Sequence, residues 1–234
     1  MISYNKKIQN IIDLAKNGEP NKALALLYAM NLNNPGDYHR ARAHVFSAAG
    51  KQFQARKEFE RAAEVSNRSV DVLIDYAIFL KDIGDFQTAI MLSKEAISQG
   101  DDYGLYIMGR TYYASGDLES AIKAYEAAVQ NGIVNAMFNL ANAYEAIGND
   151  KAAIDWFTQC VQRGDEDAEV RLAEVYLRRK IASNEDLPPL PYEWYLEGCK
   201  QLNEVAESIG ERKLAQQYAS LCRTFKSPDE IDED

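Results

Sequence analysis

The chain has 234 residues, of which 47% are hydrophobic and 26% charged, a composition that excludes global disorder. Its net charge of −10 argues against nucleic acid and anionic membranes as partners. Residues 1–100 hold 13 basic and 11 acidic residues, whereas residues 101–234 hold 13 basic and 25 acidic, so a basic partner would be drawn to the C-terminal half. Only 6 prolines and 13 glycines punctuate stretches rich in Ala, Leu, Glu, Lys and Gln, which predicts an all-α fold.

Asn, Gln and Asp interrupt every apolar run in residues 1–18, so we expect no secretory signal. No stretch approaches the roughly 18 consecutive apolar residues of a membrane helix. The three cysteines, Cys160, Cys199 and Cys222, are widely spaced among helical residues, which is typical of reduced packing residues. We therefore expect a cytoplasmic protein.

From residue 18 onward a glycine recurs at intervals of 32, 34, 32 and 32 residues, at Gly18, Gly50, Gly84, Gly116 and Gly148. An alanine stands five residues after each glycine, and a large apolar residue stands four residues before it. This pattern predicts a helical hairpin in each repeat, with helix A ending at a left-handed glycine and helix B following at once. Asp85, Asp117 and Asn149 directly follow three of these glycines and are expected to cap helix B.

The position seven residues before the turn glycine is small in every repeat after the first: Ala43, Ala77, Gly109 and Ala141. A small residue there would let helix B approach closely. One hairpin cannot bury its apolar face alone, so neighbouring hairpins must stack.

Beyond residue 166 the repeat becomes irregular, because Lys180 stands where the next glycine should be and a proline-rich segment, residues 184–191, follows. This segment is expected to be a rigid spacer, and the preceding basic triplet, residues 178–180, to favour the helix dipole. Two further helices, over residues 191–209 and 211–226, are expected to cap the stack. The acidic tail, residues 227–234, is expected to be disordered.

Two segments, GRTYYASGDLESAIKAYEAAV from residue 109 and LANAYEAIGNDKAAIDWFTQCV from residue 140, resemble tetratricopeptide repeats. The turns over residues 132–136 and 164–168 also resemble those of Sel1-like repeats. The resemblance implies a right-handed superhelical solenoid of stacked antiparallel helix hairpins, forming one domain over residues 1–226. Its repeats would span about 4–34, 37–68, 71–100, 103–132 and 135–164, with an atypical repeat and cap over 167–226.

In this family helix A lines the concave groove, and its ligand-facing positions lie at fixed distances before the turn glycine. Carried over to this sequence, they imply a groove that contains Arg40, His44, Ile74, Ile78, Lys81, Tyr106, Arg110, Tyr113, Phe138, Asn139, Asn142, Glu145 and Glu174. Aromatic residues beside Arg and Asn suit an extended peptide or a helix. The alternative is that some of these aromatic residues pack between adjacent helices.

The family's carboxylate clamp for chaperone tails is not expected here, because Ile8 and Ile12 stand where Lys and Asn are needed. Arg110 and Asn142 occupy equivalent positions in consecutive repeats and are candidates to hold a ligand backbone or carboxylate.

No feature of the sequence supports catalysis. The two histidines, His39 and His44, are five residues apart and do not form a metal-binding i, i+4 pair. The sequence has no phosphate-binding loop, zinc-type cysteine pair or nucleophile elbow, so we expect neither enzyme activity, cofactor nor metal. The leading hypothesis is a protein-interaction scaffold, monomeric or weakly self-associating. The alternative is a dedicated inhibitor, such as a toxin-neutralising immunity protein, which the acidic C-terminal half would suit.

Overall fold

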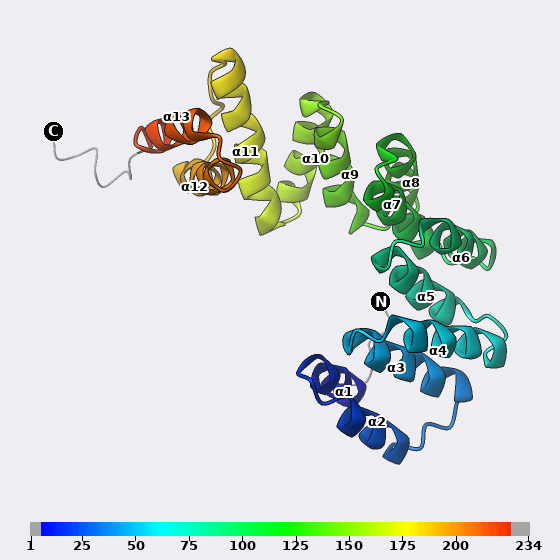
Figure 1. The fold of residues 1–234 in the computed structure, drawn as a ribbon. Helices are drawn as coiled ribbons and strands as arrows, with labels where there is room; N and C mark the ends of the chain where they lie inside the picture. The colour runs from blue at the N-terminus through cyan, green and yellow to red at the C-terminus, as the bar shows by residue number, and fades with distance from the viewer. Residues whose placement is uncertain (1–5, 226–234) are drawn as a thin grey trace. The chain divides into compact units, whose positions relative to one another are not determined.

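The computed structural model describes residues 6–225, and every regular element among them is an α-helix (Figure 1). These helices are α1 (Lys6–Lys16), α2 (Pro20–Ala29), α3 (Pro35–Ala48), α4 (Gln52–Val65), α5 (Val70–Asp82), α6 (Phe86–Ser98), α7 (Tyr103–Ser115), α8 (Leu118–Gln130), α9 (Ala136–Ala146), α10 (Asp150–Gln162), α11 (Glu166–Ser183), α12 (Tyr192–Ser208) and α13 (Arg212–Cys222). The predicted all-α class is confirmed. Within this range no helix is both long and apolar enough to cross a bilayer.

The predicted turn glycines all adopt the left-handed conformation, with φ between 71° and 88°. The predicted caps are also present. Asp85 accepts a hydrogen bond from the Thr88 amide at 3.3 Å, Asp117 from the Ser120 amide at 3.1 Å, and Asn149 from the Ala152 amide at 3.2 Å. Each accepting side chain satisfies one of the otherwise unpaired amides of the first helical turn.

A second series of left-handed residues, Gly100, Gly132 and Gly164, connects helix B of one repeat to the next repeat. Asn67 stands at the corresponding position one repeat earlier, with φ of 52°, and the next residue, Arg68, is also left-handed, with φ of 57°. This conformation costs a non-glycine residue about 1–2 kcal/mol. The Arg68 guanidinium donates two hydrogen bonds of 2.5 Å to Glu95, and the Gln99 side-chain amide donates to the Arg68 carbonyl at 3.2 Å. These contacts hold the turn to α6.

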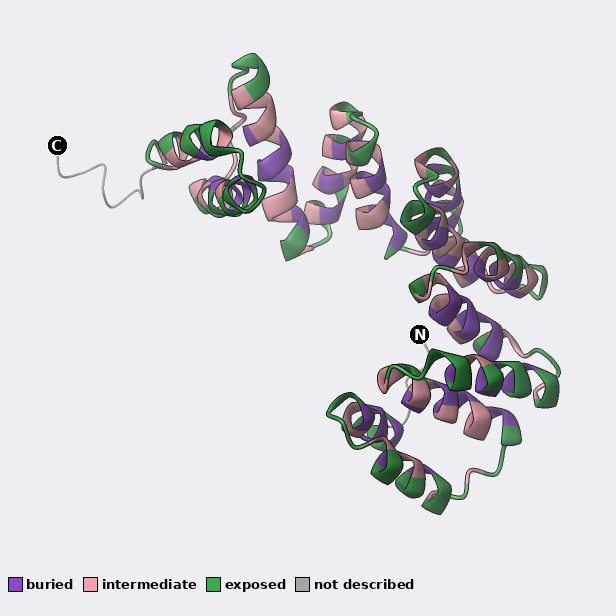
Figure 2. Cartoon of the chain, in the orientation of Figure 1, coloured by how far each residue is buried: buried purple, intermediate pink, exposed green. Residues whose placement is uncertain are grey.

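The chain divides into two compact units, one up to residue 136 and one from residue 137 onward. In the first unit, consecutive helices pack as the hairpins α1–α2, α3–α4, α5–α6 and α7–α8. The A helices also pack on one another, as α1 on α3, α3 on α5 and α5 on α7. Buried positions line the sides on which helices of a unit meet, whereas the turns are mostly exposed (Figure 2). The main core of this unit surrounds Phe59, Leu73 and Leu80.

In the second unit α11 packs on both α10 and α12, and α12 packs on α13. With Lys180 in place of a turn glycine, α11 continues to Ser183 and ends at Asn184, which takes the left-handed conformation. The proline-rich segment that follows contains no helix, and the Tyr195 hydroxyl donates to the Pro188 carbonyl at 2.7 Å. The two expected capping helices are α12 and α13, although α13 ends at Cys222 rather than residue 226. The acidic tail lies outside the described residues, and the single domain over 1–226 stays a prediction.

Candidate functional site

The A helices α3 and α5 are joined by a network of charged side chains. Arg40 on α3 is only 6% exposed, and its guanidinium lies 3.7 Å from Asp71 and 3.8 Å from Asp75 on α5. It also lies 3.4 Å from Asp37, one helical turn earlier on α3. The His44 Nε2 is 3.0 Å from the Asp75 carboxylate. Three carboxylates thus surround one guanidinium, which leaves an excess of negative charge on this part of the surface.

Helix α7 packs on α5, and Tyr103 and Tyr106 pack against the core that contains Ile74 of α5. Burial raises the pKa of the Tyr103 hydroxyl. The Tyr103 and Tyr106 rings lie 5.3 Å apart, and the Arg110 guanidinium lies 5.7 Å from the centre of the Tyr106 ring. Such a cation–π contact holds both side chains in place on one face of the helix.

These residues lie on three A helices that pack on one another in order. We call this group the α3–α5–α7 face, and it consists of Arg40, His44, Asp71, Asp75, Tyr103, Tyr106 and Arg110. The structure therefore brings together four of the site residues that the sequence predicted on these helices.

The other predicted residues of this unit have different surroundings. Ile74 is 8% exposed and belongs to the core, so it offers little surface to a ligand. Ile78 is half-buried against the same core, and Lys81 pairs with the neighbouring Asp82. Tyr113 is exposed at the end of α7. Ile74 is thus part of the core, whereas Ile78, Lys81 and Tyr113 each leave some surface accessible.

In the second unit the predicted residues lie on α9 and α11. The Phe138 ring packs edge-on against Phe157 at 5.6 Å, and Asn139 and Asn142 are half-buried on the same helix. Glu145 accepts a hydrogen bond of 2.7 Å from Arg171 and another from Arg178. These two arginines hold α11 against α9.

Glu174 is 3% exposed and pairs with Arg171. Burial raises the pKa of this carboxyl, although the charges of Arg171 and Arg178 act in the opposite direction. Arg178 is not among the site residues that the sequence predicts, because a basic triplet at the end of a helix also favours the helix dipole. Its position seven residues after Arg171, on the same side of α11, was the available signal.

We expect Glu174→Gln to stabilise the protein at neutral pH. The pKa of Glu174 is raised above its ordinary value of 4.5, so the folded chain holds the proton more tightly than the unfolded chain. Stability contributed by this group therefore falls as pH rises from 4.5 through the raised pKa. The advantage of Glu174→Gln should shrink as the pH is lowered toward 4.5, as measured by urea unfolding at several pH values.

The control for this experiment is Glu166→Gln, which removes a charge from the exposed first turn of the same helix. Because a carboxylate there favours the helix dipole, this variant should be slightly destabilised at neutral pH. Equal effects of the two substitutions would contradict the role given to burial.

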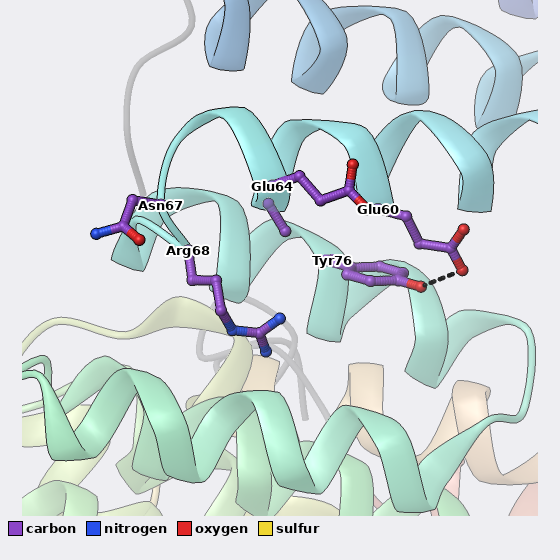
Figure 3. Close-up of a pocket in the computed structure, with 6 residues that line it drawn as sticks. Glu60, Glu64, Asn67, Arg68 and Tyr76 are labelled. Atoms are coloured by element: carbon purple, nitrogen blue, oxygen red, sulfur yellow. Dashed lines mark hydrogen bonds between the residues drawn. The ribbon is translucent and has the colours of Figure 1, made fainter.

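A pocket of about 360 Å³, which the sequence did not indicate, opens between α4 and α5 (Figure 3). Glu60, Glu64, Arg68 and Tyr76 line it together with Ala63 and Asn67. The Tyr76 hydroxyl lies 3.5 Å from Glu60, and burial, followed by the charge of Glu60, raises the Tyr76 pKa to about 12. The pocket presents carboxylates and a phenol but contains no histidine or cysteine. Among residues 6–225 no group of acidic, histidine and cysteine side chains is placed to hold a metal ion.

Residues 106–168, from α7 into α11, match the model of the tetratricopeptide repeat family. This segment of the chain is therefore similar to tetratricopeptide repeats. The match covers the two hairpins in which the expected pattern of small, aromatic and glycine positions is most complete. It gives no support to the Sel1-like resemblance of the inter-repeat turns.

Solved structures show how widely this tetratricopeptide fold is shared. Pseudomonas aeruginosa PilF is 16% identical with a TM-score of 0.63, and the alignment covers 92% of this chain and 96% of PilF. The C-terminal part of a tetratricopeptide repeat-containing protein from Cytophaga hutchinsonii is 15% identical with a TM-score of 0.60, over 96% and 98% of the two chains. MamA from Desulfovibrio magneticus RS-1 is 19% identical with a TM-score of 0.53, over 69% and 96%. No curated protein matches the chain. At these low identities, the structural similarity shows a common fold.

Proposed function

We propose that this tetratricopeptide repeat protein is an interaction scaffold that binds a segment of another protein on its α3–α5–α7 face. The observation that supports this proposal is the packing of α3 on α5 and of α5 on α7, which carry the His44–Asp75 pair and the Tyr103–Tyr106–Arg110 group. A repeat fold with this kind of surface supports protein–protein interaction. The cytoplasmic location and the absence of a cofactor stay predictions.

The chemistry of the face suggests what kind of segment it binds. Around Arg40 the three aspartates outnumber the one guanidinium, so this end favours a basic side chain of the partner. The two tyrosine rings on α7 provide apolar contact area with hydroxyl groups at their edges, as in many binding hot spots. Arg110 can then pair with a carboxylate or a backbone carbonyl of the bound segment.

Partners captured by the wild-type chain should be lost by Arg110→Glu, because the reversed charge removes the cation–π contact and repels a bound carboxylate. We expect the affinity for the captured partner to fall at least about tenfold, the usual effect of a lost hot spot. Phe138→Ala tests the predicted residues of α9 in the same way. The measurement is affinity capture with mass spectrometry, followed by calorimetric titration of each captured partner.

Two measurements make the result interpretable. Lys57→Glu reverses an exposed charge on the B helix α4, away from the proposed face, and should leave the affinity unchanged. Thermal unfolding of Phe138→Ala separates loss of binding from loss of the Phe157 contact. If Arg110→Glu binds every captured partner as the wild type does, the proposed surface is wrong; Phe138→Ala tests only the predicted residues of α9, which lie outside that surface.

A further inference from the structure

The last two helices, α12 and α13, form a hairpin with a defined register. They meet at the left-handed Gly210, and at the open end of the hairpin the rings of Tyr195 and Phe225 stack 5.2 Å apart at 10°. Cys199 lies four residues after Tyr195, and Cys222 lies three residues before Phe225. Cys199 is therefore one helical turn from Tyr195 on the same side of α12, and Cys222, the last residue of α13, is three residues before Phe225.

The next turn toward Gly210 follows the same register. Leu202 on α12 and Tyr218 on α13 are both buried, and they belong to the core cluster that also contains Cys199 and packs against Cys222. Cys199 and Cys222 thus lie between the Tyr195–Phe225 pair and the Leu202–Tyr218 pair. Register and packing together place the thiols opposite each other across the hairpin.

The two thiols also lie close enough for Cys222 to influence the ionisation of Cys199. Burial raises the pKa of the Cys199 thiol, and the hydrogen bond with Cys222 raises it further. Cys199 is fully buried, whereas Cys222 is only partly buried near the end of α13. A small oxidant therefore reaches Cys222 first. Cys160, the third cysteine, is buried alone on α10, where burial raises its pKa to about 11.

We propose that Cys199 and Cys222 form a redox-active dithiol site, which a low-molecular-weight disulfide oxidises to an intramolecular disulfide between α12 and α13. The Cys222 thiolate attacks one sulfur of glutathione disulfide, so the S–S bond of the oxidant breaks and one glutathione thiolate leaves. The Cys199 thiolate then attacks the Cys222 sulfur of the mixed disulfide and displaces the second glutathione. Two protons pass from the cysteines to the departing thiolates, and the two cysteines lose two electrons to the oxidant.

The disulfide would fasten the terminal helix to its neighbour. Helix α13 is the last described helix, it packs on α12, and its outer side is mostly exposed, so few contacts prevent its local opening. A covalent link across the hairpin restricts that opening. Because Cys199 is buried with a raised pKa, the second step should be slow at neutral pH and faster in mildly alkaline buffer.

The test treats the full chain with glutathione disulfide, blocks the remaining thiols by alkylation, and maps tryptic peptides by mass spectrometry. Trypsin places the three cysteines in separate peptides, residues 152–163, 181–200 and 214–223. We expect the last two peptides to appear linked, with a loss of two hydrogens, while Cys160 remains alkylated. Cys160→Ser should give the same link, and Cys222→Ser should give none.

The linked protein should release α13 several times more slowly during limited proteolysis than the reduced protein, and a reductant should reverse the effect. A glutathione adduct that persists on Cys222 without forming the link would overturn the proposal. So would links chiefly between molecules, or a link that leaves the proteolysis of α13 unchanged.

Discussion

Phe59→Ala should unfold the first unit at a much lower urea concentration than the wild-type chain requires. The Phe59 ring is fully buried and lies within 5.3 Å of the rings of His44, Tyr76 and Phe79. Truncation removes the apolar contacts of α4 with α3 and α5 and leaves a cavity that a packed repeat cannot fill. Substitutions of this kind cost about 3–5 kcal/mol.

The chain itself offers the control and the probe for this experiment. Phe53 is on the same helix but is 69% exposed, so Phe53→Ala should change stability by no more than about 0.5 kcal/mol. Both tryptophans, Trp156 and Trp194, lie in the second unit, so their fluorescence reports that unit, whereas far-UV circular dichroism reports both. Phe59→Ala should shift the dichroism transition more than the fluorescence transition.

Phe157→Ala should give the reverse result, because Phe157 is equally buried but belongs to the second unit. If dichroism and fluorescence shift together for both variants, the repeats unfold as one cooperative body and the expectation of local unfolding is wrong.

Gly109→Ala should destabilise the first unit although alanine is the better helix former. A Cβ at Gly109 would lie 2.6 Å and 2.7 Å from two ring carbons of Tyr125, which is 1% exposed and has no room to withdraw. Overpacking of this kind costs about 1–3 kcal/mol, against a gain of up to about 1 kcal/mol in helix propensity. We expect a net loss of about 1–2 kcal/mol in chemical denaturation.

Ala114→Gly provides the matched measurement, because Ala114 is exposed on the same helix and its replacement reports helix propensity alone. That variant should lose up to about 1 kcal/mol. Replacing Tyr125 by Leu in the Gly109→Ala background should restore part of the stability, since the smaller side chain makes room for the methyl group. A Gly109→Ala variant more stable than the wild type would refute the tight approach of α7 and α8.

The spacing of the turn glycines was sufficient to predict the hairpins. Left-handed glycine and a following capping residue are local requirements, so they remain visible in the sequence. The tight position at Gly109 could also be predicted, because the equivalent residue is small in every repeat after the first. That Gly109 faces the large ring of Tyr125 could not be predicted, since it depends on the partner helix.

The candidate site was predictable only in part. Family positions indicated Arg40, His44 and the tyrosine–arginine pair of α7, but burial separated Ile74 from a binding role. The pairing of Arg178 with Glu145 was not visible, because it joins residues on two helices whose relative rotation is set by packing. The pocket beside Tyr76 is lined in part by Arg68, and no local pattern predicts the left-handed conformation of that arginine.

The packing of helices only on near neighbours has a consequence for how the protein is made. Within the first unit each A helix contacts its own B helix and the adjacent A helices, so most tertiary contacts join residues separated by one repeat or less. Each hairpin can therefore dock on the preceding one as soon as it leaves the ribosome, without waiting for the C-terminal part of the chain. Growing chains should thus acquire protease resistance stepwise, one hairpin at a time.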